Sequence, residues 1–221
     1  MKCSVVMLVM VLVSSCYVDA REALRQQSPG EQKVTSAADN EPETKIKPNN
    51  FQTAVTSYNR KDWGSGWVDE DSDCQDTRAE VLIAESRVAV TFRSKKDCVV
   101  DTGEWLCPFT GRTFYRASDL DVDHIVPLKE AHLSGGYQWS RAKKKKYAND
   151  LSDPNHLIAV HKGANRSKGA RDIAQWLPKN QNFHQEYVKI FIDIKKTWQL
   201  SMDQSECQVV QSLLKLNLCS H

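Results

Sequence analysis

Residues 119–128, DLDVDHIVPL, constrain the fold more than any other stretch of the chain. Three aspartates alternate with apolar residues and lead directly into a histidine and then a proline. Residues two apart share a face of a strand, so Asp119, Asp121 and Asp123 are expected to point the same way. Neighbouring carboxylates repel one another unless a positive charge lies close to them. The pattern therefore predicts a strand over residues 119–126 with a cation beside it.

A divalent metal ion is the cation that suits such a strand best, because hard metals prefer carboxylate and amide oxygens. His124 follows Asp123 directly, and an imidazole, whose pKa is ordinarily near neutrality, is suited to act as a general base. Asn155 lies just before a later apolar strand, and Asn165 follows ten residues after it. Asn165 offers an amide oxygen that could complete a metal site with Asp123.

The spacing of apolar residues predicts an α+β domain made of short strands and several helices. We expect helices over residues 77–86, 140–151, 182–200 and 203–216, and one that begins at Ala164. Strands are expected over residues 87–92, 119–126 and 156–160, with turns and short strands between 98 and 115. Thr77 is the expected N-cap of the first helix, with Glu80 completing a capping box.

The chain is predicted to contain three segments. Residues 1–20 have a basic start, an apolar run and small residues before Ala20, which is typical of a cleaved signal peptide. Residues 21–56 are polar, contain proline and have few large apolar side chains, so we expect a flexible linker or a propeptide. Residues 57–221 are expected to form one domain, secreted to the extracellular space and not associated with a membrane.

Five cysteines remain after the predicted signal peptide. Export favours disulfides, and an odd number leaves one thiol over. No CxxC pair occurs, which argues against a structural zinc site. We prefer Cys74 with Cys98 and Cys207 with Cys219, leaving Cys107 free, although the sequence alone allows other pairings.

Charge is informative only in its distribution, since the formal net charge is +2. Basic residues gather in residues 141–146, RAKKKK, and again in residues 162–171, which contain no acid. Such runs are compatible with a polyanionic partner, but they are more often solvated helix faces.

Several spaced motifs together resemble one known family. DVDHIVPL, then an N-x-L-x-x-V segment, then N-R-x-K-G is similar to the ββα-metal motif of HNH endonucleases. The wider series CQDTRAEVL, DVDHIVPLKEAHLSG, YANDL, LIAV, NRSKGARD and QWLP resembles the HNH portion of GmrSD-type restriction enzymes, in a secreted branch. The resemblance covers residues 67–221, with a helical insertion between His124 and Asn155 and an asparagine where the final histidine usually stands.

The resemblance implies a role for each matching residue. His124 would be the general base, oriented by the carbonyl of Asn155. Asp123 and Asn165 would bind one Mg²⁺ or Mn²⁺ ion. Asp121 either supports that site, which we prefer, or is simply solvated. The residues expected to contact nucleic-acid phosphates are Arg166, Lys168, Lys144 and Lys145.

The resulting prediction is a secreted, disulfide-stapled, metal-dependent HNH endonuclease. We expect it to be a monomer that hydrolyses nucleic acid, DNA more readily than RNA, with little sequence preference, since no separate base-reading module is evident. Two alternatives stay open: a nuclease-like protein that binds nucleic acid without cutting it, and a secreted, disulfide-stapled interaction protein whose acidic strand holds Ca²⁺ passively.

Overall fold

The computed structural model describes residues 57–216, which form a mixed α+β domain. The predicted signal peptide, the predicted linker and Cys219 lie outside the described residues. The α+β class predicted from the sequence is confirmed. Among the described residues, no helix is long and apolar enough to cross a membrane.

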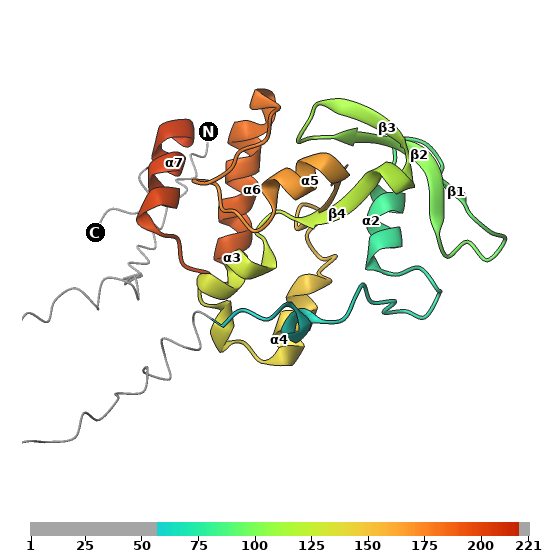
Figure 1. Cartoon of the computed structure of the whole chain (residues 1–221), viewed down its shortest axis with the longest axis horizontal. Coiled ribbons are helices and arrows are strands. Elements are labelled where there is room, and N and C mark those ends of the chain that lie inside the picture. The colour runs from blue at the N-terminus through green and yellow to red at the C-terminus, as the bar shows by residue number, and fades with distance from the viewer. Residues whose placement is uncertain (1–56, 217–221) are drawn as a thin grey trace, which may run out of the picture. The chain divides into compact units, whose positions relative to one another are not determined.

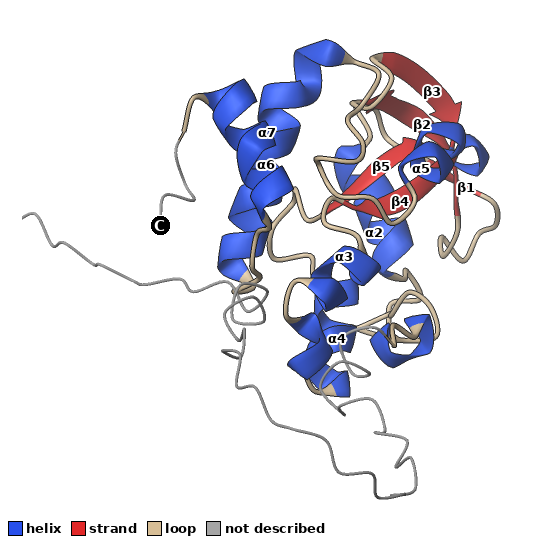
Figure 2. Cartoon of the chain, turned by 60° about the vertical axis from the view of Figure 1, so that its left-hand side comes forward, coloured by secondary structure: helices blue, strands red, loops and turns tan. Residues whose placement is uncertain are grey.

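A pair of antiparallel strands forms the middle of the domain (Figure 1). β4 (Leu120–His124) pairs with β5 (Leu157–His161), and Asp123 lies opposite Ile158. α5 (Lys162–Lys168) follows β5 directly and lies against both strands (Figure 2). β4, β5 and α5 therefore lie against one another, although 32 residues separate the two strands in the sequence.

β5 is buried on both faces because it separates two hydrophobic clusters. Leu157 and Ala159 pack into a cluster with α2 (Thr77–Glu85) and β2 (Val100–Cys107). Ile158 and Val160 belong to the second, larger cluster, which is built on α6 (His184–Thr197). A strand buried on both faces needs an unbroken apolar run, which the sequence LIAV supplies.

A second sheet has three antiparallel strands in the order β1-β2-β3. Its strands are β1 (Thr91–Phe92), β2 (Val100–Cys107) and β3 (Arg112–Arg116). The predicted strand over residues 87–92 is reduced to its last two residues. The backbone N–H of Arg87 still donates to the carbonyl oxygen of Glu104, but the hydroxyl of Ser86 donates to the carbonyl oxygen of Val88 and accepts from the backbone N–H of Glu104. These bonds bend the chain, and the regular strand starts only at Thr91.

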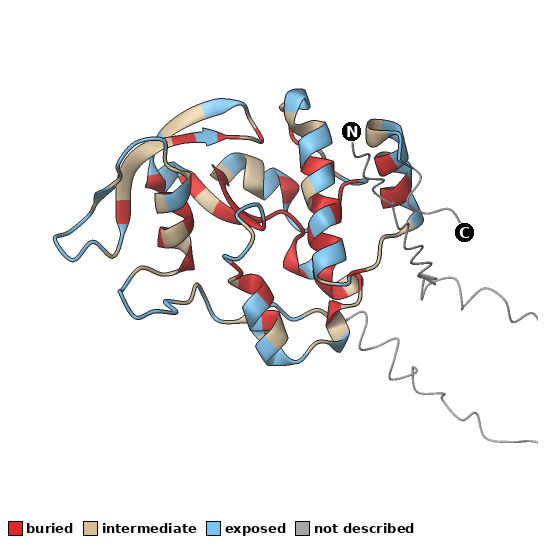
Figure 3. Ribbon diagram, turned by 180° about the vertical axis from the view of Figure 1, so that it is seen from behind, coloured by how far each residue is buried: buried red, intermediate tan, exposed pale blue. Residues whose placement is uncertain are grey.

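The remaining helices cover the two clusters. They are α3 (Leu128–Leu133), α4 (Arg141–Ala148), α6 (His184–Thr197) and α7 (Gln204–Leu214), with short 3-10 turns at Arg60–Trp63, Ala117–Asp119, Gly136–Gln138 and Gln181–Phe183. α6 shows one buried and one exposed face in Figure 3, as its apolar spacing predicts.

Helix boundaries differ from the predictions by a few residues, and one cap differs in identity. The side chain of Asp76, not Thr77, accepts the hydrogen bond from the backbone N–H of Ala79 that caps α2. The hydroxyl of Thr77 instead donates to the carbonyl oxygen of Val68.

The predicted Cys74–Cys98 disulfide is confirmed, and Cys107 is free and buried, as predicted. Cys207 is also disulfide-bonded.

Candidate active site

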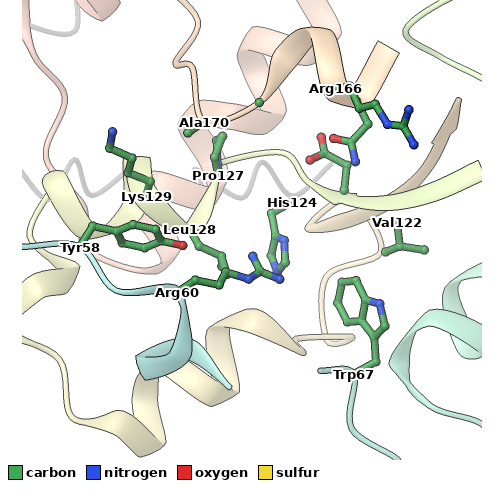
Figure 4. A pocket seen from close by; sticks show the side chains of 13 residues that line it. Tyr58, Arg60, Trp67, Val122, His124, Pro127, Leu128, Lys129, Arg166 and Ala170 are labelled. Atoms are coloured by element: carbon green, nitrogen blue, oxygen red, sulfur yellow. The ribbon is translucent and has the colours of Figure 1, made fainter. Parts of the chain in front are cut away.

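A depression of about 400 Å³ lies where β4 ends, between α3 and α5 (Figure 4). Asp123, His124, Asn165 and Arg166 all contribute to its lining. Asp123 and Asn165 are 42 positions apart in the sequence, and the pairing of β4 with β5 carries α5 back beside β4. Four of the residues that the resemblance assigned to the site are therefore brought to one pocket.

His124 is held by the end of a helix. Its Nε2 lies 3.0 Å from the carbonyl oxygen of Ala148, at the end of α4. The last carbonyls of a helix have no partner within the helix, and here the neighbouring one, of Tyr147, lies 2.7 Å from Nε2 of His156. A carbonyl can only accept, so Nε2 of a neutral His124 carries the hydrogen and Nδ1 carries the free lone pair.

Burial keeps the imidazole of His124 neutral. Desolvation lowers the pKa of His124 well below its ordinary value, and the nearby His156 and the positive charge of Arg60 lower it further. The indole of Trp67 lies almost parallel to the imidazole, with 5.7 Å between ring centroids. A neutral ring in a fixed orientation is the form that can accept a proton.

Asn155 occupies a different place from the one expected. Its side chain is exposed on the turn before β5, and its backbone N–H donates to the carboxylate of Asp153. The imidazole is oriented instead by the hydrogen bond that its Nε2–H donates to the carbonyl oxygen of Ala148. The helix that ends at Ala148, between the two strands, ends beside His124. The carbonyl oxygen of Ala148 therefore takes the place that was expected for the carbonyl of Asn155.

Asp123 is buried and paired with an internal cation. The ammonium of Lys168 lies 2.7 Å from Oδ2 of Asp123 and 2.6 Å from the carbonyl oxygen of His124. The prediction that Lys168 contacts phosphate is corrected here, because its side chain is fully buried. Burial raises the pKa of Asp123 and the charge of Lys168 opposes that rise, while burial also lowers the pKa of Lys168.

Asn165 is oriented by the other acidic residue of the strand. Its Nδ2 donates to Oδ2 of Asp121 over 3.1 Å. With the amide nitrogen engaged in this way, Oδ1 is the atom left for another partner. α5 ends three residues later, since Gly169 adopts a φ of +60° and donates its N–H to the carbonyl oxygen of Asn165.

The pocket offers oxygen donors that suit a hard divalent cation. Among the residues that line the pocket, the carboxylate of Asp123 and Oδ1 of Asn165 supply the carboxylate and amide oxygen donors, since Nδ2 of Asn165 faces Asp121. One carboxylate and one amide oxygen, with water and phosphate oxygens completing the shell, fit Mg²⁺ or Mn²⁺ better than Zn²⁺.

The predicted phosphate-binding residues separate into two groups. Arg166 is exposed at the pocket and Lys145 is exposed on α4. Lys144 is buried instead, with its ammonium 3.4 Å from the carbonyl oxygen of Tyr137 and 6.0 Å from the centroid of Trp63, so the expectation of a phosphate contact is corrected for this residue.

Further pocket residues were not anticipated from the sequence. They are Tyr58, Arg60, Trp67 and Lys129. The first three precede His124 by more than fifty residues, and no periodicity links the two regions.

Two groups of three carboxylates in the described part of the chain lie outside the pocket. Asp69, Asp71 and Asp73 are exposed in the loop before α2. The second group, Glu130, Asp172 and Glu206, is buried and already contains a counter-charge. The ammonium of Lys195 lies 2.9 Å from Glu130, 3.0 Å from the carbonyl oxygen of Ser201, and in contact with Glu206.

Comparison with known proteins relates the chain to one family and one secreted relative. Residues 77–208 match the family of GmrSD restriction endonucleases, C-terminal domain, and the chain belongs to this nuclease-related family. It is also 34% identical over 153 residues to an uncharacterized secreted protein of Arthroderma benhamiae (strain ATCC MYA-4681 / CBS 112371). That similarity covers 69% of this chain and 72% of the relative. No solved structure matches the chain.

Proposed function

We propose that the protein is a secreted, metal-dependent endonuclease of HNH type that hydrolyses phosphodiester bonds of nucleic acid. The observation that carries the proposal is the convergence of His124, Asp123 and Asn165 on one pocket, with the imidazole neutral and fixed. Membership of a restriction endonuclease family supports the same reaction. The secreted relative and the Cys74–Cys98 disulfide support an extracellular location, with residues 1–20 as signal peptide and 21–56 as linker or propeptide.

His124 is the proposed general base. Its Nδ1 is the nitrogen with a free lone pair, since Nε2 faces the carbonyl oxygen of Ala148. Nδ1 accepts a proton from the attacking water, and the resulting imidazolium donates through Nε2 to that carbonyl. General-base catalysis of this kind contributes roughly 10²- to 10⁴-fold to a rate.

Asp123 and Asn165 are the proposed holders of one Mg²⁺ or Mn²⁺ ion. When bound, such an ion polarises the scissile phosphate and neutralises the leaving oxygen. Asp121 contributes by fixing the amide of Asn165, and Lys168 contributes by holding Asp123 and the carbonyl of His124 together. Lys168 is thus proposed as a positioning residue of the site.

The proposed substrate is DNA in preference to RNA, bound through its backbone with little sequence preference, by a monomeric enzyme. Arg166 at the pocket and Lys145 on α4 are the exposed cations, among those predicted, that can contact phosphates. Contacts to phosphate position a nucleic acid without reading its bases.

A substrate and metal panel tests the proposal. The purified full chain is incubated with double-stranded DNA, single-stranded DNA and RNA, each with Mg²⁺, Mn²⁺, Ca²⁺, Zn²⁺ or a chelator. We expect cleavage with Mg²⁺ or Mn²⁺ and none with the chelator, with DNA cut faster than RNA. Binding without cleavage under every condition would instead support a nuclease-like binding protein.

Metal titration separates the roles within the site. Asp123→Asn and Asn165→Ala are expected to weaken Mn²⁺ binding in calorimetry, whereas His124→Ala is expected to retain it while losing cleavage. Unchanged Mn²⁺ affinity in both ligand variants would contradict the assignment of Asp123 and Asn165.

A further inference from the structure

One wall of the pocket is made by residues 58–67, here called the N-terminal segment. Tyr58, Arg60 and Trp67 line the pocket beside His124. All three precede residues 77–208, the part of the chain that matches the family. The site of this protein is therefore completed by residues that the family match does not include.

The N-terminal segment is fixed to the domain. Trp63 is 1% exposed, and its ring centroid lies 5.4 Å from that of Tyr147 and 5.8 Å from that of Trp139. The backbone N–H of Val68 donates to Oδ1 of Asn149 over 3.0 Å. Anchors inside and just after the segment therefore hold its exposed side chains at set positions.

Arg60 points from this segment toward the imidazole of His124 (Figure 4). Its side chain is exposed, and it makes no ion pair with a carboxylate among residues 57–216. A guanidinium that lines a pocket without a carboxylate partner among these residues can bind an anion such as phosphate.

The charges around the pocket are arranged on two sides. In Figure 4 Arg60 and Lys129 lie on one side of His124, and Arg166 lies on the other. The one acid that lines the pocket, Asp123, already faces Lys168. A strand of nucleic acid that places a phosphate at His124 would therefore meet a cation in both directions along its backbone.

We infer that Arg60 forms a second phosphate subsite, across His124 from Arg166, which binds a backbone phosphate next to the scissile one. This inference rests on the proposed function and specifies how its substrate is held. The nucleic-acid strand crosses the pocket from α5 to the N-terminal segment, and residues outside the family match set its path.

The test compares Arg60→Gln with Lys61→Gln in the full chain carrying His124→Ala, so that binding is measured without cleavage. Lys61 is the matched control because it is adjacent and exposed but does not line the pocket. The probe is a fluorescein-labelled 20-nucleotide single-stranded DNA, followed by anisotropy at several salt concentrations with Mg²⁺ present. Arg60→Gln is expected to weaken binding about tenfold and to reduce the salt slope by about 0.7, whereas Lys61→Gln changes both little. Arg60→Lys is expected to restore much of the salt slope.

The outcomes distinguish this inference from the proposed function. Equal affinity and equal salt slope in Arg60→Gln and Lys61→Gln would overturn the subsite, whether or not the wild-type chain cleaves DNA. Loss of affinity in Arg60→Gln without cleavage by the wild-type chain would overturn the nuclease and leave the subsite. In the cleaving background, a lower kcat with unchanged KM for Arg60→Gln would also overturn the subsite, since it places Arg60 at the reacting phosphate. If Arg60→Gln fails to fold, Arg60→Met is measured in its place, and wild-type affinity and salt slope in that variant would overturn the inference.

Discussion

The ammonium of Lys168 lies 2.7 Å from Oδ2 of Asp123, inside the domain and away from solvent. The same ammonium lies 2.6 Å from the carbonyl oxygen of His124. One buried cation therefore joins the proposed metal ligand to the backbone of the proposed base. Each carboxylate of β4 has a partner, which explains how the strand tolerates two of them. The ammonium of Lys168 pairs with Asp123, and the amide of Asn165 donates a hydrogen bond to Asp121.

Replacing Lys168 is expected to destabilise the domain strongly. Lys168→Met leaves the carboxylate of Asp123 buried without its cation, and loss of one partner of a buried pair costs about 3–5 kcal/mol in the free energy of unfolding. Urea denaturation measures the change. The matched control is Lys145→Met, an exposed lysine of α4, which is expected to change that free energy by at most about 0.5 kcal/mol. Equal stabilities of the two variants would contradict a structural role for the pair.

Much of the central fold follows from the sequence. The alternation in DLDVDH, the stop at Pro127 and the apolar run LIAV predict β4 and β5, and the structure pairs them. Their long separation does not prevent pairing, because the intervening residues form α3 and α4, which pack on the core.

The burial of Lys168 was also open to prediction from helical spacing. Asn165 and Lys168 are three residues apart and share a helix face, so an inward Asn165 requires an inward Lys168 and an outward Arg166. The positions of Asn155 and Arg60 could not be predicted from helical spacing. The position of Asn155 relative to His124 depends on where α4 ends, and that of Arg60 depends on the burial of Trp63; tertiary packing determines both.

Glu85 is expected to make stability depend on pH. It accepts a hydrogen bond from the backbone N–H of Ala159, and burial raises its pKa from 4.5 to about 7. The unfolded chain therefore releases this proton at lower pH than the folded chain does. This contribution to stability is fully present below about pH 4.5, is lost as the pH rises to about 7, and is constant above that value.

Comparison with Glu85→Gln isolates this effect, because the amide keeps an oxygen acceptor and cannot ionise. Unfolding in urea is measured at pH 5 and pH 8 for both proteins. The free energy of unfolding of Glu85→Gln, minus that of wild type, is expected to be larger at pH 8 than at pH 5, by up to about 3 kcal/mol. A difference between the two proteins that is the same at both pH values would contradict the shifted pKa.

Asn165 is expected to carry no glycan when the chain is secreted from a eukaryotic host. Asn165-Arg166-Ser167 is the one N-x-S/T sequon in the sequence. Asn165 lies on α5, and its side-chain nitrogen already donates to Asp121 on β4. A glycan on that nitrogen would occupy the proposed metal ligand. Peptide mass spectrometry before and after glycosidase treatment decides the matter, and a glycan mass on this peptide would refute the metal-site assignment.

The Cys74–Cys98 disulfide is expected to contribute to stability through the unfolded state. It closes a loop with a sequence separation of 24 residues, for which chain entropy gives about 3 kcal/mol. The double variant Cys74→Ser, Cys98→Ser is compared with wild type by urea denaturation under non-reducing conditions. A change of less than about 1 kcal/mol would show that this crosslink does little for the domain.

Cleavage of supercoiled plasmid DNA by the full chain and by His124→Ala, side by side, tests the central claim most directly. With Mg²⁺ or Mn²⁺ present, the wild-type chain is expected to nick and linearise the plasmid, and His124→Ala is expected to be slower by roughly 10²- to 10⁴-fold at a temperature where circular dichroism shows that both proteins are folded. A chelator is expected to stop the wild-type reaction. Equal cleavage by the two proteins, or cleavage that persists in the chelator, would contradict a metal-dependent nuclease with His124 as its base.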